Sequence, residues 1–177
     1  MKVFITGEPG IGKTTLVKSV AKKLGKEAIG FWTEEVRDRK SGKRKGFKVV
    51  TTEGSETIFA SKTFRSKKLV GSYGVNVKRF EDAVIPVLEK ALRSAGKKVV
   101  VIDEVGKMEL FSRSFREIVR ELAHDPRVTL LATLPIRDVH PLVKELRRLP
   151  GSVLIELKKS NRDQMDEEIL KLLKTNS

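Results

Sequence analysis

The chain has 177 residues, of which 39% are apolar and 34% are charged, and it contains no cysteine. This length and composition suit one hydrophobic core, so we expect a single domain spanning residues 1–177. The lack of cysteine excludes disulfides and thiolate metal sites. Because no run of 18 uncharged apolar residues occurs, we predict no membrane partner, a cytoplasmic location and a monomer.

The net charge of +14 is concentrated in one part of the chain. Residues 37–79 hold 13 basic and 3 acidic residues, a local charge of +10. Such a field favours polyanions, either nucleoside triphosphates or nucleic acid. The chain also has one Gln and three Asn, a composition typical of proteins from very hot environments.

The first half of the chain predicts strands punctuated by glycine. Hydrophobic patterns indicate a buried strand at 2–6, a helix at 14–24 that ends at Gly25, and a strand at 28–33. A turn rich in Ser, Gly and Lys then separates two β-rich segments, which predicts an antiparallel hairpin. With short strands at 58–60 and 69–77, residues 34–77 are interpreted as a basic β insert.

The second half alternates helices and strands. A long amphipathic helix is expected from Arg79 to Gly96, with Pro86 bending it. The β-branched run at 99–102 predicts a central parallel strand through 99–104. The remaining predicted elements are a helix at 114–124, a strand at 128–133, a helix at 142–149, a strand at 152–157 and a helix at 163–173. This order predicts an α/β fold with a mostly parallel sheet flanked by helices and an antiparallel β insert.

The segment GEPGIGKTTL, residues 7–16, matches the phosphate-loop spacing G-x-x-x-x-G-K-[ST] between a predicted strand and a predicted helix. Its glycines leave backbone N–H groups free to reach anionic oxygens, and the helix dipole points at the same place. A glycine-rich connection without a ligand is the alternative, but a chance match in this context is rare. We predict nucleotide binding by Gly7, Glu8, Pro9, Gly10, Ile11, Gly12, Lys13, Thr14 and Thr15.

Two carboxylates follow the apolar run, at the edge where open parallel sheets bind ligands. Lys13 is predicted to reach the β- and γ-phosphates, the Thr14 hydroxyl to ligate Mg²⁺, and Asp103 to hold Mg²⁺ through water. Glu104 is predicted to orient or deprotonate the attacking water, so Glu104 and Lys13 are the expected catalytic residues. The alternative for Glu104 is a solvated charge or an ion-pair partner.

The motifs together resemble the THEP-type nucleoside-triphosphatase family of P-loop NTPases. The resemblance spans nearly the whole chain, and its most specific element is DEVGKMEL; the other segments are GEPGIGKTTL, GFWTEEVR, YGVNV and NRD. It implies a RecA-like fold with an extra strand between the two motif strands. It also implies Mg²⁺-dependent hydrolysis of several nucleoside triphosphates with weak base preference.

The resemblance extends to residues beyond the loop. Gly106 would let the backbone pass close to the γ-phosphate. Thr133 would either sense the γ-phosphate or bond at a strand end, and both interpretations stay open. Lys107 and Glu109 belong to the signature without a task that we can derive.

Other polar residues have two interpretations each. Thr33, Glu34, Glu35 and Arg37 either face the site or form a hairpin edge. The candidates for an arginine that offsets transition-state charge are Arg113, Arg116 and Arg137. The triplet Asn161, Arg162 and Asp163 could contact the base, although we favour Asn161 as a helix N-cap.

The leading hypothesis is therefore a Mg²⁺-dependent nucleoside triphosphatase. A nucleotide or nucleoside kinase is the second, because phosphoryl transfer to a hydroxyl uses the same loop. An ATPase gated by RNA or DNA bound to the basic insert is the third, and it is not favoured because no aromatic residues alternate with the basic ones. DEVG also fits the D-x-x-G pattern of regulatory GTPases, but nothing downstream resembles N-K-x-D.

Overall fold

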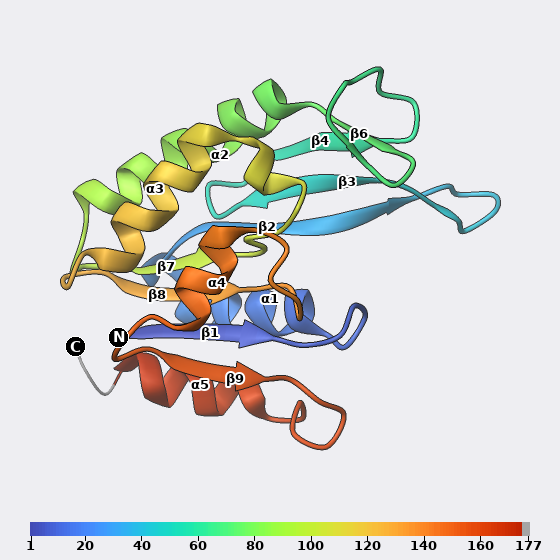
Figure 1. Ribbon diagram of the computed structural model, residues 1–177. Coiled ribbons are helices and arrows are strands. Elements are labelled where there is room, and N and C mark those ends of the chain that lie inside the picture. The colour runs from blue at the N-terminus through green and yellow to red at the C-terminus, as the bar shows by residue number, and fades with distance from the viewer. Residues whose placement is uncertain (175–177) are drawn as a thin grey trace.

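The computed structural model describes residues 1–174, which contain one nine-stranded sheet with helices on both faces (Figure 1). The strands are β1 Lys2–Thr6, β2 Ala28–Arg37, β3 Arg44–Thr51, β4 Glu56–Ser61, β5 Leu69–Val70, β6 Tyr73–Val75, β7 Val99–Ile102, β8 Thr129–Thr133 and β9 Val153–Glu156. The helices are α1 Lys13–Leu24, α2 Val77–Arg93, α3 Arg113–His124, α4 Pro141–Arg147 and α5 Met165–Lys174, and short 3₁₀ helices η1 and η2 cover Gly25–Glu27 and Glu109–Phe111. No helix in the described part of the chain is long and apolar enough to cross a membrane.

One half of the sheet is parallel, in the order β2-β7-β8-β1-β9. Strand β8 separates β1 and β7, the two strands that lead into the predicted motifs, so the expected extra strand is confirmed. Because these strands run in the same direction, their carboxyl ends meet at one edge. The register pairs Ile5 with Thr133 and Ile102 with Ala132, which places the ends of β1, β7 and β8 side by side.

The other half of the sheet is the predicted antiparallel insert, in the order β5-β6-β4-β3-β2. Strand β2 belongs to both halves, because residues 28–31 pair with β7 and residues 31–37 pair with β3. It is therefore four residues longer than the predicted strand at 28–33. The short strands with glycine punctuation predicted at 69–77 are β5 and β6, and Gly71, at φ 57°, turns the chain between them.

Alternation along the parallel strands builds a core on each face of the sheet. Phe4, Ile102 and Leu130 face α2, α3 and α4, whereas Val3, Ile5 and Val101 face α1 and α5. Figure 1 shows the two helical layers with the sheet between them. The fold is the predicted α/β arrangement of a mostly parallel sheet flanked by helices with an antiparallel insert, and its central strands are buried on both sides.

Helix α2 differs from its prediction at both ends. It begins at Val77, because the side chain of Asn76 accepts a hydrogen bond from the Arg79 N–H and caps the helix. It ends at Arg93, ahead of Gly96. Pro86 lies inside the helix as expected.

Candidate active site

The phosphate loop connects β1 to α1 through residues 7–12. Gly12 has φ 114° at the N-terminus of α1, a left-handed conformation that a residue with a Cβ adopts only with strain. The N–H groups of the first turn of α1 have no side-chain cap, and that turn contains no acidic residue. The loop can therefore hold an anion at the helix N-terminus.

Lys13 folds back across this loop. Its Nζ donates to the carbonyl of Gly7 at 2.9 Å and lies 3.2 Å from Glu104 Oε2. Its side chain is 11% exposed, so the positive charge lies at the phosphate loop and not in open solvent. The loop, the lysine and the acid that follows β7 are thus brought together.

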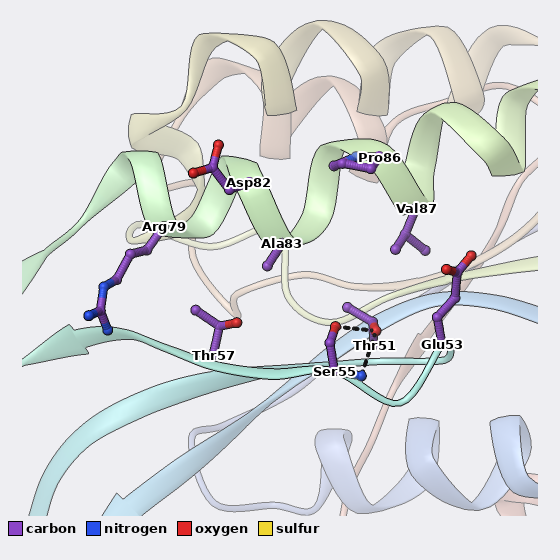
Figure 2. Close-up of a pocket in the computed structure, with 9 residues that line it drawn as sticks. All are labelled: Thr51, Glu53, Ser55, Thr57, Arg79, Asp82, Ala83, Pro86 and Val87. Carbon is purple, nitrogen blue, oxygen red and sulfur yellow. Dashed lines mark hydrogen bonds between the residues drawn. The ribbon is translucent and has the colours of Figure 1, made fainter.

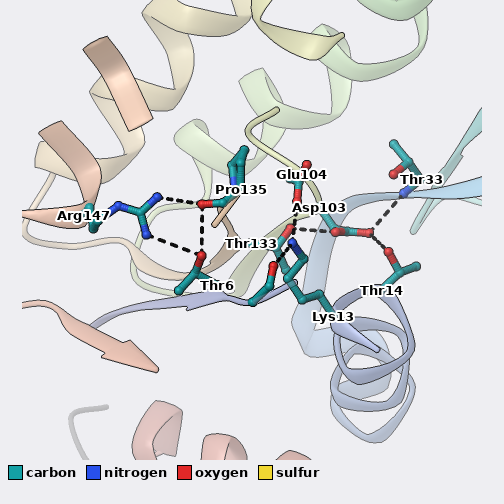
Figure 3. A network of polar contacts seen from close by, with 10 residues as sticks. Thr6, Lys13, Thr14, Thr33, Asp103, Glu104, Thr133, Pro135 and Arg147 are labelled. Atoms are coloured by element: carbon teal, nitrogen blue, oxygen red, sulfur yellow. Dashed lines mark hydrogen bonds and ion pairs between the residues drawn. The ribbon is translucent and has the colours of Figure 1, made fainter. Parts of the chain in front are cut away.

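Asp103 is the centre of a buried hydrogen-bond network (Figure 3). Its Oδ2 accepts from the Thr14 hydroxyl at 2.7 Å and from the Thr33 N–H at 3.4 Å, and its Oδ1 accepts from the Thr133 hydroxyl at 2.6 Å. Burial raises the pKa of Asp103 to about 6, while the hydrogen bonds from Thr133 and Thr14 act in the opposite direction. Residues from α1, β2 and the end of β8 therefore meet on one carboxylate at the end of β7.

Glu104 is half-exposed, and its two oxygens have different neighbours. Oε2 contacts Lys13, and Oε1 lies 2.6 Å from the point where a Cβ at Gly106 would stand. The carboxyl of Glu109 reaches the same point at 2.9 Å. Gly106 thus leaves room for two acidic side chains, a reason for glycine here that the sequence did not reveal.

The remaining predicted residues divide into those near the network and those outside it. Thr33 joins it through its N–H, while Glu34 pairs with Lys18 and Glu35 pairs with Arg37, both outside it. Thr133 is completely buried and bonds at the end of its strand. Its contact with a γ-phosphate stays a prediction.

The arginine candidates lie elsewhere. Arg113 pairs with Glu117 on the exposed face of α3, Arg116 donates to the carbonyl of Leu110, and Arg137 is exposed. None of these contacts involves the phosphate loop or Asp103.

Sequence reasoning missed Arg147 on α4. Its guanidinium donates to the Pro135 carbonyl at 2.6 Å and to the Thr6 hydroxyl at 3.4 Å, and its Nε pairs with Asp138. Figure 3 shows it joining the segments after β1 and β8, beside the network. No local sequence pattern predicts this contact, because only tertiary packing brings α4 to the ends of β1 and β8.

The segment after β9 also reaches the loop. Arg162 donates to the carbonyl of Ile11 at 3.1 Å. The predicted N-cap role of Asn161 is wrong, because α5 begins four residues later, at Met165. The Asn161 amide instead closes a turn, accepting from the Lys158 N–H and donating to the Glu156 carbonyl.

The site has few candidate metal ligands of its own. Within residues 1–174, no group of three or more His, Cys, Asp or Glu side chains is arranged to hold a metal ion. The Thr14 hydroxyl and the Asp103 carboxylate are adjacent oxygen donors, the kind that hard divalent cations prefer.

A groove of about 540 Å³ lies elsewhere, between α2 and the β3–β4 turn (Figure 2). Its lining is mixed, with Arg79 and Asp82 from the helix and a hydrogen-bonded Thr51–Ser55 pair from the turn. None of the residues that line it belongs to the phosphate loop or contacts Asp103. The polar network, and not this groove, is therefore the candidate active site.

The chain is similar to known proteins along nearly its whole length. The family model described as NTPase matches residues 2–170. The chain belongs to the THEP-type nucleoside-triphosphatase family. The resemblance predicted from the motifs is thereby confirmed.

Members of the family match along almost their entire length. The nucleoside-triphosphatase THEP1 of Aquifex aeolicus is 65% identical over 176 residues, covering 98% of this chain and 99% of that protein. The crystal structure of THEP1 from this hyperthermophile superposes with a TM-score of 0.92 at 63% identity, covering 98% of this chain and 99% of that one. The solution structure of a human cancer-related nucleoside triphosphatase gives a TM-score of 0.82 at 35% identity, covering 99% and 98%.

Proposed function

We propose that this protein is a Mg²⁺-dependent nucleoside triphosphatase that hydrolyses ATP, GTP and other nucleoside triphosphates to diphosphate and phosphate. Membership of a nucleoside-triphosphatase family makes it a hydrolase of phosphoanhydrides. One observation carries the assignment: the phosphate-loop Lys13 and the acid Glu104 lie within 3.2 Å of each other at the carboxyl edge of the parallel sheet.

The chain's own groups divide the work of hydrolysis. Backbone N–H groups of the loop and the Lys13 ammonium bind the β- and γ-phosphates and offset the charge that develops on them. The Glu104 carboxylate orients a water molecule in line with the γ-phosphorus and accepts its proton. A bound triphosphate would compete for Lys13, which frees Glu104 Oε2 for this task.

The donor set near the loop fits Mg²⁺. This ion keeps several waters and takes only one or two protein ligands beside substrate phosphates, which matches a hydroxyl and a carboxylate 2.7 Å apart. We assign the direct contact to Thr14 and the water-mediated contact to Asp103. Mg²⁺ held by these two residues would supply positive charge that offsets part of the negative charge of the triphosphate.

Weak base preference is supported by the segment beside the loop. The Asn161 carboxamide, the group best suited to reading a base edge there, uses its oxygen and its nitrogen to bond backbone groups. The neighbouring Lys158 and Lys159 are exposed and carry no acceptor on their side chains. We therefore expect the triphosphate, and not the base, to supply most of the affinity.

The alternative functions make different products. A kinase would transfer phosphate to a nucleoside or nucleotide, and a nucleic-acid-gated enzyme would hydrolyse ATP faster with RNA or DNA. The exposed Lys40, Lys43 and Lys45 of the insert form no ion pair among the described residues, which is the one observation that favours the nucleic-acid alternative. A cytoplasmic location and a monomeric state stay predictions.

One experiment separates these functions. Phosphate release is measured with ATP, GTP, CTP and UTP, in Mg²⁺ and in EDTA, with and without nucleosides, nucleoside monophosphates and RNA. We expect release from all four triphosphates in Mg²⁺ alone, and none in EDTA. A phosphorylated acceptor in place of free phosphate would establish the kinase, and release only with RNA would establish the gated enzyme.

A further inference from the structure

Glu109 is a buried acid without a cationic partner in the described part of the chain. Its residue exposure is 6%, and no Lys, Arg or His there forms an ion pair with it. Burial, followed by the negative charge of Glu104, raises the pKa of Glu109 well above its usual range, against hydrogen bonds from its own N–H and that of Gly106. A buried carboxyl in such surroundings destabilises the fold, so its presence requires another explanation.

Glu109 lies beside Glu104, the proposed general base. Glu104 Oε1 and Glu109 Oε1 both lie within 3 Å of the position that a Cβ of Gly106 would take. The other oxygen of Glu104 contacts Lys13. Each oxygen of the Glu104 carboxylate therefore has a different neighbour. Lys13 lies beside Oε2, and the Glu109 carboxyl lies on the side of Oε1.

The backbone that carries Glu109 is firmly held. Gly106 O accepts from the Leu110 N–H at 2.9 Å, and Glu109 O accepts from the Ser112 N–H at 3.1 Å. Ser112 in turn caps α3, accepting from the Phe115 N–H at 3.0 Å. Nearer β7, the Val105 N–H donates to the Thr133 carbonyl at 3.0 Å. Backbone hydrogen bonds to β8 and to the N-terminus of α3 thus hold the segment that carries Glu109 in place.

We propose that Glu109 is a positioning residue for hydrolysis, whose buried carboxyl lies against Gly106 beside Glu104 and thereby sets the direction of the Glu104 carboxylate. This inference rests on the proposed function, because it assigns a task relative to Glu104. A carboxylate that activates water as a general base must be placed within a fraction of an ångström of its productive position. The position of Glu109 meets that need without a contact to the substrate.

Three substitutions separate position from charge. Glu109→Gln keeps the length and the acceptor oxygen, Glu109→Asp keeps the charge but withdraws the carboxyl by one methylene, and Glu109→Ala removes the group. The matched control is Glu117→Gln, on the exposed face of α3. For each variant, kcat and KM for MgATP, the affinity for a non-hydrolysable ATP analogue, and thermal unfolding are measured.

We expect Glu109→Gln to keep kcat within about threefold of the wild type, and Glu109→Asp and Glu109→Ala to lose about 10- to 100-fold in kcat. Affinity for the analogue should change less than about twofold, because Glu109 does not touch the phosphate loop. Full turnover in Glu109→Ala would overturn the inference. So would an equal loss in Glu109→Gln and Glu109→Asp, or a loss of affinity in parallel with kcat. A wild type that releases no phosphate would refute the proposed function itself, whatever the variants do.

Discussion

Lys13 Nζ lies 3.2 Å from Glu104 Oε2, although one residue follows β1, the other follows β7, and β8 runs between these strands. The pair shows that the two sequence motifs form one site across an intervening strand. It also accounts for the low exposure of Lys13, since the carboxylate and the Gly7 carbonyl together balance a partly desolvated ammonium.

Replacing Lys13 tests the phosphate contact. Lys13→Ala removes the charge aimed into the loop, so we expect the affinity for MgATP to fall at least about tenfold, the scale of one charge-assisted hydrogen bond. Lys18→Ala is the matched control on the same helix, because Lys18 is exposed and pairs with Glu34 outside the network. Calorimetry measures the affinity of both variants for MgATP. Unchanged affinity in Lys13→Ala would remove Lys13 from the binding site.

Asp103→Asn should separate stability from activity. The pKa of Asp103 is raised from 3.8 to about 6 by burial, so the native state holds this proton more tightly than the unfolded state. The Asp103 carboxyl therefore contributes a loss of stability as pH rises from about 4 to 6, and this contribution is absent from Asp103→Asn. At pH 7 we expect the variant to be more stable by about 1–3 kcal/mol.

The measurement is urea unfolding of both proteins between pH 4 and 8, with phosphate release alongside. Hydrolysis by Asp103→Asn should fall sharply, because an amide is a poor partner for a Mg²⁺-bound water. A stability difference that does not change with pH would show that the Asp103 carboxylate is not disfavoured in the native state.

Gly106→Ala should reduce turnover with little effect on folding. The new methyl group would meet the carboxylates of Glu104 and Glu109 at 2.6 and 2.9 Å, and these flexible side-chain ends can move aside. We expect kcat to fall about tenfold or more while the affinity for an ATP analogue is kept. Ser114→Ala is the control, because Ser114 is an exposed residue of α3. A fully active Gly106→Ala would mean that the arrangement of the two acids is not required.

Arg162→Ala tests the contact between the segment after β9 and the phosphate loop. Loss of the bond to the Ile11 carbonyl should loosen the loop and raise KM about two- to fivefold with kcat nearly unchanged, as expected for one exposed hydrogen bond. Lys159→Ala, three residues away from Arg162 and exposed, supplies the comparison. Equal KM values in the two variants would show that this contact does not shape the loop.

The parts of the site that could be predicted are those with a short-range cause. The phosphate loop needs glycines, a lysine and a threonine at fixed spacing, and Asp103 with Glu104 follows a run that only a buried strand explains. The parallel half of the sheet followed from the alternation of strands and helices.

The parts that could not be predicted depend on contacts between distant segments. Glu109 and Arg147 acquire partners only after η2 and α4 are packed against the strand ends. The N-cap prediction for Asn161 is wrong because Asn is common both at N-caps and in turns. In the structure its side chain bonds the backbone groups of Lys158 and Glu156, which makes it a turn residue. The predicted strand at 28–33 and the first arm of the predicted hairpin form one continuous strand, β2, whose second half pairs with β3.

The most direct test of the account is a comparison of Glu104→Ala with the wild type, measuring MgATP affinity and phosphate release on the same preparations. The account predicts that affinity is kept within a few-fold while turnover falls about 100-fold or more, the contribution of a general base. Full turnover in Glu104→Ala would contradict it, because the water-activating group would then have to be some other residue.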